Sequence, residues 1–115
     1  MPSLSGIGRE DGTHNVYVAH LTRDVLCKKK FSEANPERSS SGLCLYVGFT
    51  RLSPTERFRN HKSGYKASRW VRDYGRGLLP RFYSGLNKMS YSRAEEVEVV
   101  LAEFLREKGH AVWQN

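Results

Sequence analysis

Two short apolar runs, Asn15–Leu21 and Leu43–Phe49, constrain the fold of this chain most. Both are rich in β-branched and aromatic residues, which suit a pleated and half-buried surface. Each run has a tyrosine near its centre, Tyr17 and Tyr46. Because side chains alternate between the two faces of a strand, both phenols should leave the face that the neighbouring valines occupy. The two phenols can then converge if the strands pair, although core packing explains each tyrosine taken alone.

The chain between these strands, residues 22–42, combines turn signals with the basic run Lys28-Lys29-Lys30. We predict a hairpin whose connection is unusually long and basic. Residues 1–13 are rich in Gly, Ser and charge and have no apolar period, so they are expected to form a flexible arm. Residues 14–115 are the right size for a single domain.

Helix signals dominate the second half of the chain. Ser53-Pro54-Thr55-Glu56 combines a capping serine, a proline suited to the first turn and a capping-box glutamate, and it predicts a helix over Pro54–Ser63. Lys66–Tyr74 predicts a second helix that Gly75 closes in a left-handed conformation. Ser92-Arg93-Ala94-Glu95 is another capping box, and it starts the longest helix, which ends before Gly109.

A third strand is expected at Arg81–Tyr83, after Pro80, and His110–Trp113 should form a short terminal strand or extended tail. Together these elements predict an α+β fold with a small, mainly antiparallel sheet flanked by three helices. The predicted order is ββααβα with a short C-terminal tail.

Charge narrows the choice of partner. Nineteen Lys and Arg residues against twelve Asp and Glu residues give a net charge of +7, which favours a polyanion, most commonly nucleic acid. A membrane partner is not expected, because no apolar run approaches the roughly 20 residues that cross a bilayer. No secretory leader is recognisable either, so a cytoplasmic location is expected. Cys27 and Cys44 lack the spacing of a zinc site or a disulfide framework.

One carboxylate of the last helix is expected to point inward. With about 100° per residue, the residues of the apolar arc are Ala94, Val97, Val100, Leu101, Phe104 and Leu105. Glu98 lies at the margin of that arc, while the other four glutamates of the helix point away from it. A carboxylate at a core margin needs a partner, so Glu98 is either a buried salt-bridge member, which is the commoner case, or a metal ligand.

Arg57 and His61 are four positions apart and therefore share one face of the first helix. A fixed cation beside a titratable imidazole can stabilise charge on a phosphate and move a proton. Taken alone, an Arg and a His on a surface helix are more often simply solvated.

These residues occur in an order that resembles the GIY-YIG nuclease superfamily. The resemblance rests on Asn15-Val16-Tyr17, Tyr46-Val47-Gly48, Arg57 with His61, and Ala94 with Glu98, and it extends over about Val16 to Val112. The first motif has Asn15 where the family usually has glycine, and segment 22–42 is an insertion. The family often has an asparagine after the helix that carries the metal ligand, and the late candidate here is Asn115.

The resemblance implies a metal-dependent endonuclease. Glu98 would hold Mg²⁺ (or Mn²⁺) through its oxygens. Tyr17 would help to activate water as a general base, and Arg57 would neutralise charge on the phosphate. Tyr46 and His61 would position water or phosphate, with His61 sharing the base role, and Gly48 would let the strand approach the substrate backbone. Such a one-metal site cuts one strand at a time and is compatible with a homodimer.

Basic residues that follow this site are expected to bind nucleic acid, with DNA as the expected substrate. They are Lys62, Lys66, Arg69, Arg72 and Arg76, continued by Arg81, with Lys28, Lys29 and Lys30 as a second, mobile contact. Tyr65, Trp70 and Tyr74 lie among them as stacking positions, although inward packing is the expected role of Trp70. A non-catalytic nucleic-acid-binding module remains the main alternative, followed by a basic adaptor for an acidic protein.

Overall fold

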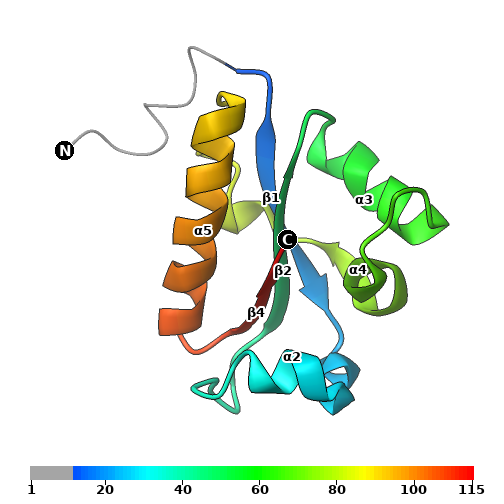
Figure 1. Ribbon diagram of the computed structural model, residues 1–115, viewed down its shortest axis with the longest axis vertical. Helices are drawn as coiled ribbons and strands as arrows, with labels where there is room; N and C mark the ends of the chain where they lie inside the picture. The colour runs from blue at the N-terminus through cyan, green and yellow to red at the C-terminus, as the bar shows by residue number, and fades with distance from the viewer. Residues whose placement is uncertain (1–11) are drawn as a thin grey trace.

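The computed structural model describes residues 12–115, which form an α+β fold on one four-stranded sheet with the order β3-β1-β2-β4 (Figure 1). The strands are β1 (Asn15–Leu21), β2 (Cys44–Thr50), β3 (Gly75–Leu78) and β4 (Ala111–Gln114). β1 runs antiparallel to β2 and β3, whereas β4 runs parallel to β2. The expected α+β class and the pairing of the first two strands are confirmed.

Helices cover both faces of this sheet. Within residues 12–115 the α-helices are α2 (Lys29–Glu33), α3 (Pro54–Ser63), α4 (Arg69–Tyr74) and α5 (Tyr91–Glu107), and the 3₁₀ helices are η2 (Arg23–Cys27) and η3 (Pro80–Phe82). Figure 1 shows α5 on one side of the strands and α3 with α4 on the other. The order differs from the expected ββααβα, because α2 lies between β1 and β2 and β4 completes the sheet. Among these residues no helix is long and apolar enough to cross a bilayer.

The third strand lies earlier than the sequence predicted. Gly75 has φ −67° and begins β3, so it is not the left-handed cap that we expected. A Cβ at Gly75 would lie 2.4 Å from the carbonyl oxygen of Val71, so this close approach to α4 requires glycine. Residues 81–83, the expected strand, instead form η3 and the turn after it. The predicted start of α3 is confirmed, with the Ser53 side chain accepting from the backbone N–H of Glu56.

The long connection 22–42 contains η2 and α2 and packs against the rest of the domain. Phe31 is fully buried, and its ring lies 5.4 Å from that of Trp70 and 6.2 Å from that of Trp113. Asn35 is also buried: its side chain accepts from the backbone N–H of Val112 at 2.8 Å and donates to the Phe31 carbonyl at 3.0 Å. These contacts fix the segment against α4 and β4.

Helix α5 turns a different face inward from the one predicted. Its buried residues are Ala94, Val97, Glu98, Leu101, Ala102 and Leu105. Val100 and Phe104, which the apolar arc included, are each 51% exposed. The helix also begins earlier, at Tyr91, and Ser90 caps it in place of Ser92. The buried arc is therefore centred closer to Glu98, which lies within it and not at its margin.

We predicted a flexible N-terminal arm over residues 1–13. Residues 1–11 of this arm lie outside the described part of the chain. From residue 13 onward the chain is attached to the domain. The backbone N–H of Thr13 donates to the Met89 carbonyl at 3.1 Å, and His14 pairs with Met89 as an isolated antiparallel bridge.

Candidate active site

The two strand tyrosines meet on one face of the sheet. Tyr17 pairs with Gly48 across β1 and β2, and Tyr46 lies two residues before Gly48, so all three share a face. The tyrosine rings are 6.1 Å apart between centroids. A Cβ at Gly48 would lie 2.7 Å from the Tyr17 hydroxyl oxygen and 3.1 Å from Cε1 of Tyr46. Glycine at this position therefore makes the space in which the Tyr17 hydroxyl sits.

Helix α3 brings His61 to these phenols. Gly64 ends the helix at φ 91°, and the imidazole of His61 is fully buried in its last turn. Nε2 of His61 lies 2.8 Å from the hydroxyl oxygen of Tyr17, and its ring makes an edge contact with Tyr46 at 5.7 Å. The structure therefore brings Tyr17, Tyr46 and His61 together in one cluster.

The hydrogen bonds of His61 determine its tautomer. The backbone N–H of Ser68 donates to Nδ1 at 2.9 Å, so Nδ1 must be the unprotonated nitrogen. In the neutral ring Nε2 then carries the proton and donates to Tyr17. Burial, helped by the charge of Arg57, lowers the pKa of His61 to about 4, which keeps the ring neutral at pH 7. This arrangement makes His61 a donor that positions Tyr17, and it does not favour the shared base role inferred from the sequence.

Arg57 lies beside this cluster in a fixed position. Nη2 donates to the Lys66 carbonyl at 2.8 Å and Nη1 to the Tyr65 carbonyl at 3.5 Å, so the turn after α3 holds the guanidinium. Burial raises the pKa of Tyr17 far above its usual range, and the positive charge of Arg57 opposes that rise. Arg57 is therefore placed to stabilise negative charge where the phenols lie.

Both phenols are neutral at physiological pH. Tyr17 and Tyr46 are 1% and 2% exposed, and this burial is the main cause of their raised pKa values. The Ser68 hydroxyl counteracts the rise in the pKa of Tyr46, whereas the negative charge of Glu98 adds to it.

Glu98 approaches from the other layer of the molecule. Its helix, α5, lies across the sheet from α3 (Figure 1), and the side chain is 4% exposed. Tyr17, Tyr46 and His61 contact one another, whereas within residues 12–115 no hydrogen bond joins Glu98 to any of them. Within residues 12–115 its Oε2 atom has no hydrogen-bond partner. Burial raises the pKa of Glu98 to about 7, although the amide of Gln114 acts to lower it. Glu98 belongs to none of the ion pairs found there, namely Lys29–Glu33, Arg72–Asp73 and Arg93–Glu96, so the salt bridge that the sequence favoured is not formed.

An unpartnered, buried carboxylate oxygen fits a divalent cation, because hard cations take oxygen ligands and supply the missing interaction. Residues 12–115 contain no cluster of three or more His, Cys, Asp or Glu side chains that could enclose a metal. A metal would therefore have Glu98 as its one carboxylate, with the Gln114 amide beside it. Sequence reasoning missed Gln114, which lies in β4 next to Val47. The one sequence signal for this position was the asparagine that the family often has after the metal-binding helix, and it pointed to Asn115, the neighbour of Gln114.

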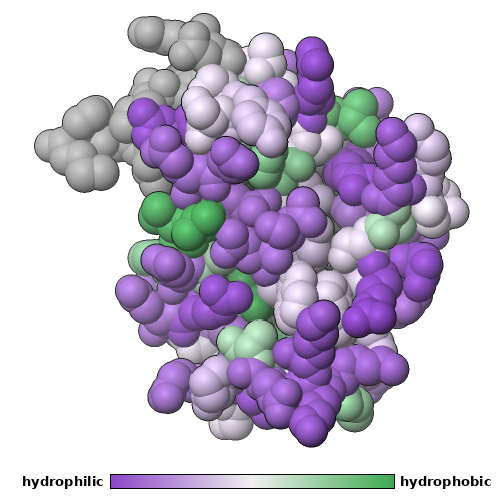
Figure 2. All heavy atoms as spheres, viewed as in Figure 1, coloured by the Kyte–Doolittle hydropathy of each residue, from purple (hydrophilic) through white to green (hydrophobic). Residues whose placement is uncertain are grey.

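Most of the predicted nucleic-acid-binding residues lie on or near α2, α3 and α4, whereas Arg76 lies on β3. Lys62 donates to the carbonyls of Arg72 and Gly75, and Arg69 lies 5.1 Å above the Trp70 ring. Lys66, Arg72 and the three insertion lysines are exposed, and Figure 2 shows hydrophilic side chains gathered over α2 and α4. Arg76 lies apart on β3, where burial lowers the pKa of His20 and the positive charge of Arg76 adds to that effect. Trp70 is 6% exposed, which confirms its inward role.

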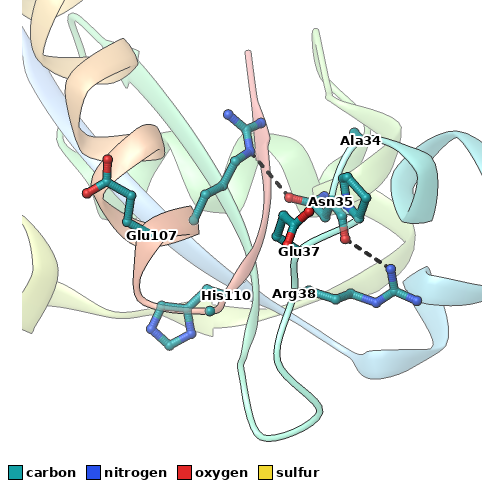
Figure 3. Close-up of a pocket in the computed structure, with 9 residues that line it drawn as sticks. Ala34, Asn35, Glu37, Arg38, Glu107 and His110 are labelled. Atoms are coloured by element: carbon teal, nitrogen blue, oxygen red, sulfur yellow. Dashed lines mark hydrogen bonds between the residues drawn. The ribbon is translucent and has the colours of Figure 1, made fainter.

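A cavity of about 370 Å³ lies elsewhere, between the end of α5 and the insertion (Figure 3). Its lining includes Asn35, Arg38, Arg106, Glu107 and His110, and it contains none of the predicted catalytic residues. The side-chain oxygen of Asn35 accepts from Arg106 at 3.3 Å, and its carbonyl accepts from Arg38 at 3.0 Å. These bonds hold the insertion in place.

No protein-family model, curated protein or solved structure matches this chain.

Proposed function

We propose that this protein is a GIY-YIG-type, metal-dependent endonuclease that hydrolyses phosphodiester bonds in DNA in the cytoplasm. One observation carries the proposal: Glu98 is 4% exposed, and within residues 12–115 one of its carboxylate oxygens has no hydrogen-bond partner. A purely structural carboxylate in that position would be costly, because burial disfavours its ionised form and nothing compensates it. A cation held by the Glu98 carboxylate would remove that cost.

Glu98, with Gln114 beside it, would hold Mg²⁺ or Mn²⁺, which polarises a phosphate and stabilises the leaving oxygen when bound. Arg57 supplies a second positive charge, fixed by two backbone carbonyls, on the side of the phenols. Charge that develops on the phosphate in the transition state is stabilised without rearranging this group.

Tyr17 handles the proton of the attacking water. Its oxygen accepts from His61, so its own O–H is free to donate to Tyr46 or to water. Because Tyr17 is neutral, it takes a proton from water only by passing its own proton on to a further acceptor such as a second water, and the His61 donor and the Arg57 charge stabilise the negative charge that develops on the phenol. Ser68 keeps His61 in the donating tautomer and so acts as a positioning residue. A homodimer would supply a second such site for the other strand.

The alternative is a non-catalytic nucleic-acid-binding module on the same fold. The burial of both phenols favours it, because a substrate phosphate must reach groups that are almost fully covered here. The two proposals differ over whether Glu98 and Tyr17 act on the substrate or only pack in the domain.

Cleavage of supercoiled DNA in Mg²⁺ and in Mn²⁺ tests the choice. Glu98→Gln and Tyr17→Phe should each lower the rate by at least about a hundredfold, which corresponds to roughly 3 kcal/mol of lost transition-state stabilisation, while DNA binding is retained. Glu103→Gln, an exposed glutamate of the same helix, is the matched control and should cut normally. A wild-type protein that binds DNA but cuts no supercoiled, single-stranded or branched substrate with either metal would establish the binding module instead.

A further inference from the structure

A second cavity, of about 360 Å³, lies between the insertion and α4. Five cationic residues line it, Lys28, Lys29, Lys30, Arg69 and Arg72, and Asp73 is its one acidic residue. We call this cavity the basic cleft. The insertion and α4 are far apart in sequence, so this concentration of charge exists only in the folded protein.

The positive charge of the basic cleft is largely uncompensated. Asp73 is already paired with Arg72 at 2.9 Å, and Lys29 reaches Glu33 only at 4.0 Å, with both side chains well exposed. Like charges held this close repel one another, and a bound anion would relieve that repulsion.

The cations of the basic cleft are supported by aromatic rings. Phe31 packs its ring against Trp70 and Trp113 and so holds the insertion beside α4. Arg69 lies 5.1 Å above the Trp70 ring, and Nζ of Lys30 lies 5.8 Å from the Trp113 ring. Because these contacts restrict the side chains before any ligand arrives, binding an anion costs less ordering entropy.

We propose that the basic cleft binds the sugar–phosphate backbone of a nucleic acid strand, at a distance from the bond that is cut. A row of cations matches the regular charge of such a strand, which carries one phosphate per about 3.4 Å of helix rise. The two arginines suit phosphate better than isolated carboxylates of an acidic protein, because guanidinium binds phosphate oxygens in pairs. The proposal concerns binding alone and does not depend on cleavage.

Helix α4 connects the basic cleft to the candidate active site. Ser68 caps α4 and donates its backbone N–H to His61, while Arg69 and Arg72, on the same helix, line the cleft. One strand could therefore contact both places. The insertion would then lengthen the substrate-binding surface by adding phosphate contacts beyond the reaction centre.

The test is fluorescence anisotropy with labelled double-stranded and single-stranded DNA in EDTA, where no cleavage can occur. Lys28→Gln with Lys30→Gln is compared with a matched control, Lys88→Gln with Lys108→Gln, which removes two exposed lysines outside the basic cleft. The cleft double variant should bind about tenfold or more weakly. Its plot of log affinity against log salt should be shallower by roughly 2 for duplex DNA, because each lost phosphate contact contributes about 0.9. Arg69→Gln should act in the same direction.

Equal affinities and equal salt slopes for the two double variants would overturn the proposal. Competition by polyglutamate as effective as that of DNA, at the same charge concentration, would also overturn it, in favour of an acidic protein partner. If the cleft variants lose DNA binding and the wild type never cuts DNA, the basic cleft stands and the nuclease proposal falls. If cutting depends on Glu98 but the two double variants bind DNA equally well, the nuclease proposal stands and the basic-cleft proposal falls.

Discussion

The buried titratable groups on the two sides of the sheet differ in their hydrogen-bond partners. On the α3 side, His61 has a partner for each ring nitrogen, Tyr17 and the backbone of Ser68. On the α5 side, Glu98 is buried almost as completely, yet within residues 12–115 one of its oxygens has no partner. Burial pushes both groups towards neutrality, but only His61 has neighbours that suit its neutral form. A satisfied network positions side chains, whereas the unpartnered oxygen of Glu98 is the observation on which the proposed metal site rests.

The largest expected effect is a pair of opposite pH dependences. Burial raises the pKa of Glu98 from 4.5 to about 7, so its contribution to stability is full below pH 4.5 and is lost as the pH rises to about 7. Burial lowers the pKa of His61 from 6.5 to about 4, so its contribution is full above pH 6.5 and is lost as the pH falls to about 4. Each contribution amounts to about 3 kcal/mol.

In the wild type these two contributions oppose each other over nearly the same pH range. Urea unfolding between pH 4 and 8 should show that Glu98→Gln makes the free energy of unfolding rise more steeply with pH than in the wild type. His61→Gln should make it fall more steeply. Glu103→Gln, an exposed glutamate of α5, serves as the control. Parallel curves for Glu98→Gln and wild type would mean that Glu98 titrates normally and is not a desolvated ligand.

The next effect concerns the space that Gly48 leaves for Tyr17. Gly48→Ala should lower the free energy of unfolding by about 1–3 kcal/mol, because its Cβ would lie 2.7 Å from the Tyr17 hydroxyl oxygen and 2.9 Å from Cζ. Gly77→Ala on strand β3 is the control, since an added Cβ there meets nothing within 4 Å. Urea denaturation measures both. Equal stability of the two alanine variants would show that the phenol has room to move.

A smaller effect should come from metal binding. At a Mg²⁺ concentration ten times its dissociation constant, the wild type should gain about 1.4 kcal/mol at pH 8, where Glu98 is ionised. The gain should shrink at pH 5.5, because protons then compete for the same carboxylate. Thermal unfolding with and without Mg²⁺ measures it, with Glu98→Gln as the reference. Equal stabilisation of wild type and Glu98→Gln would place any bound metal elsewhere.

The sequence predicted the local elements better than the way they assemble. Strand β1 and helix α3 agree with their predicted bounds, because alternation and capping are local signals. The position of β3 was wrong, because Gly75 is required by its contact with Val71, which no local pattern reveals. The packing of segment 22–42 depends on Asn35 and Phe31 meeting distant residues, so only turn and charge signals were visible there.

The candidate site shows the same division. Arg57 and His61 could be placed together from helical spacing alone, and strand pairing brought the phenols to one face as expected. The contributions of Ser68 and Gln114 could not be predicted, because they arise from the way α4 and β4 dock. The inward face of α5 was misjudged because hydropathy counted Phe104 as core, whereas the sheet selects the face that contains Glu98.

The smallest expected effect tests that face directly. Phe104→Gln should change the free energy of unfolding by no more than about 0.5 kcal/mol, since the side chain is 51% exposed. Leu105→Ala, its buried neighbour at 1% exposure, should cost about 2–5 kcal/mol. Urea denaturation of the two variants measures the contrast. A large decrease in the free energy of unfolding for Phe104→Gln would show that Phe104 belongs to the buried face of α5, as the sequence predicted.

The bond from the Val112 N–H to Asn35 joins positions 77 residues apart, and so it carries a kinetic consequence. Contacts between distant positions form late in folding, because the chain entropy lost in closing the loop must be compensated by structure that already exists. The insertion can therefore reach its native packing only after β4 has joined the sheet. In pulse-labelled hydrogen exchange, the amide of Val112 should therefore gain protection after the amides of β1 and β2, and the basic cleft should be among the last parts of the molecule to mature.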